Sequence, residues 1–216
     1  MMNISKYFDK NLGFGKDTDV AVELLKKTIE ILENFDIQYC LIAGTLLGHI
    51  RHEGFIPWDD DIDLLVDSSI IEKLPFIYKK YSNSIVLYNR ENFLIKTCFR
   101  DRVSQVLNQN HKQFLLSELD TYNWPFVDLF IYTVNGENIN FFGKDWKSSE
   151  FFPVTRKDFM GLQVMIPNNP HYFLQINYEG DYMNILQSSN FFHRTETCTR
   201  ILATMKFKDY ENTIIK

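Results

Sequence analysis

The order of apolar and polar residues along the chain predicts alternating helices and strands. After the capping sequence at residues 17–19, apolar residues recur at helical spacing, and this helix should end between residues 34 and 37. The continuous apolar run at 39–43 has the length of a buried strand, and a helix starting with LLGHI at 46–50 should follow Gly44-Thr45. The buried stripe of the first helix comprises Leu24, Leu25, Ile29 and Leu32.

The later segments continue this alternation. Strand-like apolar runs occupy residues 62–66, 85–89, 92–100, 124–132 and 163–167, and helical patterns occupy 68–81 and 171–178. Pro75 should shift the start of the first of these helices or kink it, and Glu179-Gly180 should end the second. Residues 108–123 are polar and turn-like, residues 1–16 are expected to form an irregular arm, and residues 183–216 carry no pattern that assigns an element.

The composition indicates one folded domain spanning residues 1–216. Of the 216 residues, 45% are hydrophobic, which is enough to form a substantial core. The 19 Phe and 11 Tyr residues favour a packed aromatic interior, with stacking on a nucleotide base as a second use.

The charge limits the classes of binding partner, and the cysteine content indicates the redox state of the compartment. A net charge of −5 without any Lys/Arg block argues against a nucleic-acid polymer, although small phosphates need only a few local donors. Cys40, Cys98 and Cys198 are odd in number and widely spaced, which predicts reduced thiols in a cytosol-like compartment. We find neither a signal-peptide core nor an apolar run that could span a membrane, and we therefore expect a soluble, cytoplasmic protein.

An acidic run at Asp59, Asp60, Asp61 and Asp63 carries the main chemical signal. Neighbouring carboxylates in a partly buried site raise one another's pKa unless a cation neutralises them. Asp61 and Asp63 lie two positions apart at the start of a predicted strand, so their side chains should share a face. Such a pair suits Mg²⁺, with Mn²⁺ as the alternative ion, whereas one of Asp59 and Asp60 should face solvent or orient a metal-bound water.

Other positions are candidates for the same site. Asp128 is a lone carboxylate in an apolar strand, and because burying it unpaired is costly, a cation is its favoured partner. Gly44 and Thr45 lie between a strand and a helix N-terminus, where a phosphate can be received. Arg51 could bind phosphate oxygens or form an internal salt bridge to one of the aspartates. Lys96, with apolar neighbours in its strand, is a candidate contact for a donor phosphate.

The histidines offer a weaker alternative. His49 and His52 have helical spacing, and His193 lies near Cys198, but these residues do not make up a four-ligand zinc set. We therefore interpret the histidines as structural or surface residues.

The pattern of Gly44-Thr45, Asp61-x-Asp63 and Asp128 resembles the nucleotidyltransferase fold. More narrowly, AGTLLGHIRHEGFIPWDDDIDLLV at residues 43–66 is similar to the signature of the LicD family, which includes bacterial phosphocholine transferases and fukutin-type ribitol-phosphate transferases. Looser similarity covers most of residues 20–182. The resemblance implies an α+β protein with a nucleotidyltransferase-like mixed β-sheet core flanked by helices.

Two segments depart from the family pattern. The third-Asp strand continues into Phe130-Ile131-Tyr132-Thr133 where the family usually has Phe-Pro-Leu-Asp. The family's Tyr-Gly-x-Asp-Trp-like element corresponds to residues 178–182, YEGDY, with one residue inserted. Both should lie on the acceptor side, so they leave the metal site intact and the acceptor open.

The resemblance implies Mg²⁺-dependent transfer of a phosphorylated alcohol, phosphocholine-like or ribitol-phosphate-like, from a CDP-linked donor to a sugar or glycan hydroxyl. Asp61, Asp63 and Asp128 would hold the metal, Asp128 could also accept the proton of the hydroxyl, and the four candidate phosphate contacts would bind the donor. Two alternatives stay open. One is transfer of a nucleoside monophosphate from a triphosphate to a small molecule or sugar phosphate, and the other is an inactive nucleotide-binding or interaction module.

Overall fold

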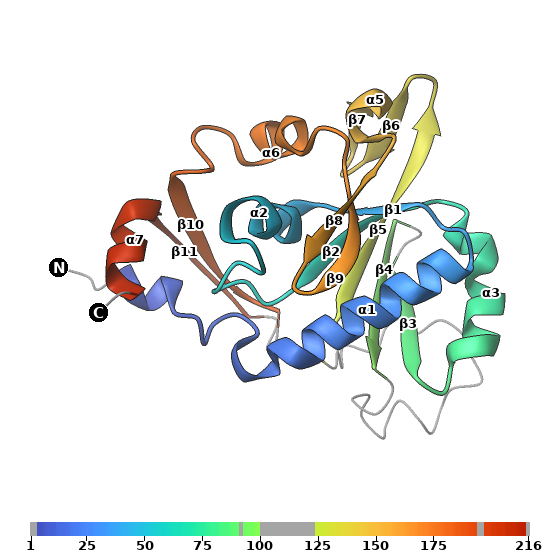
Figure 1. Cartoon of the computed structure of the whole chain (residues 1–216), viewed down its shortest axis with the longest axis horizontal. Helices are drawn as coiled ribbons and strands as arrows, with labels where there is room; N and C mark the ends of the chain where they lie inside the picture. The colour runs from blue at the N-terminus through green and yellow to red at the C-terminus, as the bar shows by residue number, and fades with distance from the viewer. Residues whose placement is uncertain (1–3, 91–92, 100–123, 194–196, 215–216) are drawn as a thin grey trace.

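A mixed β-sheet forms the centre of the protein. The computed structural model describes residues 4–90, 93–99, 124–193 and 197–214. Within these residues the strand order is β1-β2-β5-β4-β3, with β6 beside β5 and β7 beside β6 (Figure 1). β2 and β5 are parallel, and the other neighbouring pairs are antiparallel, which confirms the α+β class. The strands are β1 (Tyr39–Leu41), β2 (Ile62–Asp67), β3 (Ile85–Arg90), β4 (Leu94–Phe99), β5 (Val127–Asn135), β6 (Asn138–Phe141) and β7 (Lys144–Lys147).

Among the described helices, two cover one face of this sheet. The apolar side chains of α1 (Thr18–Asn34) and α3 (Ile70–Tyr81) meet those of β3, β4 and β5 around Leu129. The predicted stripe of α1 is buried as expected, and Pro75 lies inside α3. Because side chains alternate along a strand, Thr97 and Leu129 point toward these helices. Their neighbours Lys96 and Asp128 consequently point to the opposite face.

The strand-to-helix junction is shorter than predicted. β1 ends at Leu41 and α2 (Ala43–His52) begins two residues later, so Gly44 and Thr45 lie in the first turn of the helix instead of preceding it. Ala43 has φ +47°, a left-handed conformation that a non-glycine residue seldom adopts. α2 packs against β2 and against α6 (Pro170–Tyr178), which brings the start of α2 next to the start of β2, where the acidic run lies.

Aromatic side chains fill a second part of the interior, as predicted. The rings of Phe141 and Trp146 stack with centroids 5.1 Å apart, and both contact Phe151 and Phe173. These rings come from β6, β7, α5 (Ser148–Phe151) and α6, next to the hairpin of β8 (Thr155–Phe159) and β9 (Leu162–Ile166).

The two ends of the described chain are more ordered than the sequence pattern indicates. η1 (Ile4–Phe8) and η2 (Gly15–Asp17) are short 3₁₀ helices, and the expected irregular arm buries Tyr7, Phe8 and Phe14. Residues 183–216, to which we assigned no element, contain the antiparallel hairpin of β10 (Ile185–Phe192) and β11 (Thr197–Lys206), followed by α7 (Phe207–Ile214). η1 packs on this hairpin beside α7 (Figure 1).

Some predictions concern residues outside the described part. The turn-like stretch at 108–123 falls there, and nothing is described of the Cys198 side chain. Cys40 and Cys98 are buried free thiols, in line with the predicted reduced state. Among the described helices, none is long and apolar enough to cross a membrane.

Candidate metal centre and adjoining cavity

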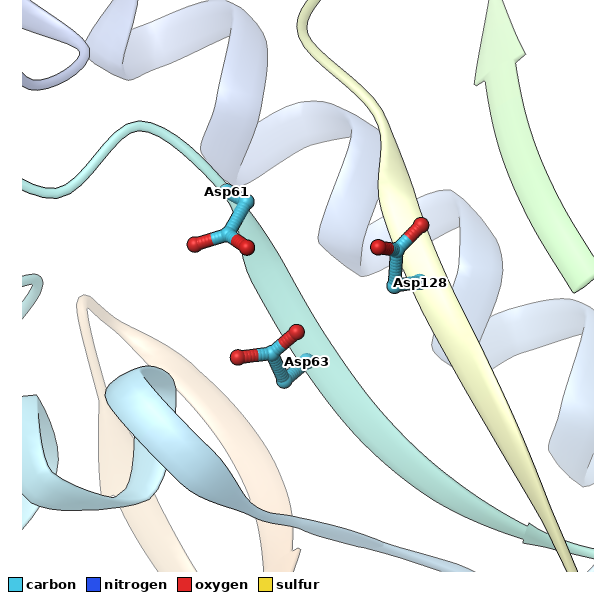
Figure 2. A group of neighbouring side chains, drawn as sticks. All are labelled: Asp61, Asp63 and Asp128. Carbon is cyan, nitrogen blue, oxygen red and sulfur yellow. The ribbon is translucent and has the colours of Figure 1, made fainter. Parts of the chain in front are cut away.

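Three carboxylates meet at one end of β2 and β5. Asp61 immediately precedes β2, Asp63 lies within it, and Asp128 is the register partner of Asp63 on parallel β5. One ligand oxygen from each residue lies within 4.8 Å of those from the other two, and the three side chains project from the same side of the two strands (Figure 2). The prediction that Asp61 and Asp63 share a face is therefore confirmed.

The electrostatics of this cluster favour a bound cation. Burial raises the pKa of Asp63 well above its usual range, and the charges of Asp61 and Asp128 raise it further. Burial also raises the pKa of Asp128, to about 6, although Lys96 acts in the opposite direction. Since all three residues offer hard oxygen ligands, their donor set fits Mg²⁺ or a similar divalent ion. Within the described part of the chain, these are the residues able to form a group of metal ligands.

Lys96 lies inside the site and forms an ion pair with the Asp128 carboxylate. It is the register partner of Asp128 on β4, and its Nζ lies 2.8 Å from Oδ2 and 2.7 Å from Oδ1 of that carboxylate. Nζ also sits 3.7 Å from the centre of the Phe126 ring. The Lys96 side chain, only 6% exposed, thus neutralises Asp128, whereas the sequence had suggested a contact with donor phosphate.

Thr45 and Gly44 contact the acidic segment, defined as residues 56–63, from the side of α2. Thr45 Oγ1 accepts a hydrogen bond of 2.9 Å from the backbone N–H of Asp63, which fixes the start of β2 to the first turn of the helix. A Cβ atom at Gly44 would run into Asp59 Oδ2. The absence of a side chain at Gly44 therefore lets the Asp59 carboxylate lie close to the first turn of α2.

Sequence comparison agrees with this geometry. Residues 36–169, more than half of the chain, match the family described as LicD/FKTN/FKRP, nucleotidyltransferase domain. The chain belongs to the LicD family.

Its curated relatives are longer proteins. A lipopolysaccharide cholinephosphotransferase LicD of Haemophilus influenzae is 46% identical over 55 residues, which are 26% of this chain and 21% of that protein. An uncharacterized protein of Rickettsia prowazekii is 24% identical over 183 residues, covering 83% of this chain and 62% of that protein. A second uncharacterized protein, from Rickettsia typhi, is 50% identical over 42 residues, covering 19% of this chain and 14% of that protein. The chain thus spans less than two thirds of the length of these relatives.

Asp59 and Asp60 have different surroundings in this LicD-family chain. The sequence left open which of the two assists the metal site. The Asp60 carboxylate turns to His193, accepting from its backbone N–H at 3.2 Å and lying 2.9 Å from its ring Nδ1. Asp59 faces the cavity described below, and burial together with the charge of Asp61 raises its pKa. Among the described residues, the group of candidate metal ligands thus consists of Asp61, Asp63 and Asp128, without Asp59 or Asp60.

His193 is the site residue that sequence reasoning missed. Its Nε2 lies 3.2 Å from Asp61 Oδ2, so one imidazole bridges Asp60 and Asp61. Burial lowers the pKa of His193, but the hydrogen bond to Asp60 and the charges of Asp61 and Asp60 raise it by more, so that the pKa lies above its ordinary value. Nothing around position 193 in the sequence signals this role, because its partners are 133 and 132 positions away.

A cavity of about 580 Å³ adjoins the acidic cluster. Its walls come from α2, the acidic segment, the end of α6, the turn that follows it, and β10. Arg51 lines it, donating from Nη1 to the carbonyl oxygens of Tyr182 (2.5 Å) and Ile185 (3.4 Å) and from Nε to His52 Nε2 (3.0 Å). Arg51 thus binds backbone carbonyls in place of the internal salt bridge considered from the sequence, and its guanidinium is held at the cavity wall. Tyr182 and Ile185 also line the cavity, together with Gly44, Leu47, Ile56, Trp58, Asp59, Tyr178, Glu179, Gly180, Asp181, Gln187, Ser188 and His193.

Proposed function

We propose that this chain is a divalent-cation-dependent transferase that moves a substituted phosphate group from a CDP-linked donor to a hydroxyl of a sugar or glycan. The observation that carries the proposal is the largely buried cluster of Asp61, Asp63 and Asp128 beside a cavity large enough for a small-molecule substrate. Membership of the LicD family supports it, as does local similarity to a protein named lipopolysaccharide cholinephosphotransferase. The carried alcohol would be phosphocholine-like or ribitol-phosphate-like.

The three carboxylates would hold Mg²⁺ or Mn²⁺. A divalent ion bound there would neutralise the charge of the donor diphosphate and the charge that develops on the departing nucleotide. Lys96 keeps Asp128 ionised and in place despite its burial. With its pKa raised to about 6, Asp128 is also suited to receive the proton of the attacking hydroxyl near neutral pH.

The cavity would receive the donor. Arg51 Nη1 donates to two backbone carbonyls, and these hydrogen bonds fix the plane of the guanidinium. Nη2 would then bind a phosphate oxygen of the donor. Gly44 lets the cavity wall approach closely, because a side chain there would displace Asp59. Thr45, whose hydroxyl already accepts from Asp63, would position the metal ligands instead of contacting phosphate directly.

Product analysis tests the reaction. The full chain is incubated with CDP-choline or CDP-ribitol, Mg²⁺ and a panel of sugars, and the products are identified by mass spectrometry. Release of CMP with a phospho-alcohol on the sugar is expected, and Asp63→Asn should abolish it. Release of pyrophosphate from a nucleoside triphosphate, with the nucleotide on the acceptor, would instead establish nucleotidyl transfer. Donor binding without any product would favour an inactive binding module.

A further inference from the structure

The C-terminal hairpin lies outside the matched family segment yet contributes to the site. The match ends at residue 169, whereas β10 begins at Ile185. Three residues of the segment at 51–60 contact residues 182–193. Arg51 donates to the carbonyl oxygens of Tyr182 and Ile185, and the Trp58 indole N–H donates to the carbonyl oxygen of Gln187. The Asp60 carboxylate contacts the ring of His193. Because these bonds link residues 51–60 to the stretch from Tyr182 to His193, which includes β10, the placement of one depends on that of the other.

The last of these contacts reaches the metal ligands themselves. Asp60 is 2% exposed, and its Oδ1 takes both the backbone N–H and the ring Nδ1 of His193. The Trp124 indole N–H donates to the Asp60 carbonyl at 2.6 Å, so the backbone of Asp60 is fixed as well. From this anchored position, the opposite ring nitrogen of His193 meets Asp61 Oδ2 at 3.2 Å.

We infer that His193 is a positioning residue that orients the Asp61 carboxylate toward Asp63 and Asp128, so that the C-terminal hairpin sets the metal affinity of the site. A partner that binds the second oxygen of a ligating carboxylate restricts its rotation and reduces the ordering needed when the ion binds. This inference rests on the metal site of the proposed function and adds to it a residue from outside the matched segment.

Two substitutions separate the contacts of His193. The amide nitrogen of asparagine corresponds in position to Nδ1, so His193→Asn keeps the contact to Asp60 and removes that to Asp61. The amide nitrogen of glutamine corresponds to Nε2, so His193→Gln can keep the contact to Asp61. His49→Gln is the control, because the ring of His49 packs on Phe159.

The test is a titration of each full-length variant with Mn²⁺, followed by electron paramagnetic resonance, together with thermal unfolding with and without Mn²⁺. We expect His193→Asn to weaken Mn²⁺ binding by about tenfold or more. His193→Gln should retain most of the affinity, and His49→Gln should match the natural chain. The shift in melting temperature caused by Mn²⁺ should follow the same order, which keeps the comparison valid even for a destabilised variant.

Other outcomes separate this inference from the proposed function. Unchanged Mn²⁺ affinity in His193→Asn, or equal losses in both His193 variants, would overturn the inference even if CDP-alcohol turnover is observed. If no transfer occurs but His193→Asn still weakens Mn²⁺ binding selectively, the positioning role stands and the proposed reaction is wrong. Absence of Mn²⁺ binding to the natural chain would overturn both.

Discussion

Thr45 and Asp63 are joined by a buried hydrogen bond, in which the hydroxyl of the helix residue accepts from the backbone N–H of the strand residue at 2.9 Å. This bond connects the first turn of α2 to the end of β2 that carries the carboxylate cluster. It explains how Thr45, which the sequence assigned to phosphate binding, can contribute by holding Asp63, a proposed metal ligand, in place.

Replacing Thr45 tests this connection. Thr45→Val keeps the shape of the side chain but leaves the buried N–H of Asp63 without its acceptor, and should lower the free energy of unfolding by about 1–3 kcal/mol. Thr45→Ser retains the hydroxyl and serves as the matched control. Urea unfolding monitored by tryptophan fluorescence measures both, and equal stabilities for the two variants would show that the bond has little effect.

Lys96→Met should destabilise the metal-free protein strongly. The substitution leaves Asp128 buried without its cation and beside Asp63, at an expected cost of about 3–5 kcal/mol. Mg²⁺ should recover part of this loss, because a divalent ion supplies the missing positive charge.

The control for this experiment is an exposed ion pair. Lys26 and Glu23 are 48% and 61% exposed, so Lys26→Met should change the free energy of unfolding by less than about 1 kcal/mol. Unfolding is measured for both variants with and without Mg²⁺. A small effect of Lys96→Met would mean that another group neutralises Asp128.

His52 should make the protein less stable in mild acid. Burial and the charge of Arg51 lower the pKa of His52 to about 3, compared with 6.5 for an ordinary histidine, and its ring packs against Trp58 and Phe207. As the pH falls below about 6.5, the unfolded chain binds a proton at this position while the folded chain does not. The contribution of neutral His52 is therefore fully present above the unfolded pKa and declines by at most about 1.4 kcal/mol per pH unit below it.

The variant His52→Gln isolates this effect. Its amide oxygen can accept from Arg51 Nε as the imidazole does, but it does not titrate. The difference in unfolding free energy between the natural chain and this variant should be constant above pH 7 and should change in favour of the variant between pH 6.5 and 4.5. A difference independent of pH would contradict the assignment of a buried neutral His52.

Two glycines of α2 should respond differently to alanine. At Gly48 a new Cβ would lie 2.5 Å from the backbone oxygen of Gly54, and since backbone cannot easily move, Gly48→Ala should cost about 1–3 kcal/mol of stability. At Gly44 the obstacle is the Asp59 side chain, which can rotate into the cavity. Gly44→Ala should therefore cost less than about 1 kcal/mol of stability but weaken donor binding by about tenfold.

Calorimetric titration with CDP-choline and chemical denaturation distinguish the two glycine variants. Unchanged donor affinity in Gly44→Ala would show that the cavity wall at this position does not contact the donor.

The regular elements of the fold were accessible from the sequence, whereas its two ends were not. α1 was predictable because Leu24 and Leu32 belong to a periodic apolar stripe, a property carried entirely by local spacing. The burial of Phe8 lacks such a signal, because it depends on contacts with Trp58 and Tyr210 from distant parts of the chain. The C-terminal hairpin was missed for a similar reason, since much of its placement depends on bonds to the acidic segment.

Local spacing alone predicts that Asp61 and Asp63 share one face, because side chains two apart on a strand must do so. The local sequence also marks Asp128 as a buried carboxylate in need of a positive partner. That Lys96 is one such partner and that His193 bridges Asp60 and Asp61 could not be predicted from local spacing and is seen in the folded chain. Strand register and the docking of a remote hairpin set these contacts, and both depend on the packing of the whole chain.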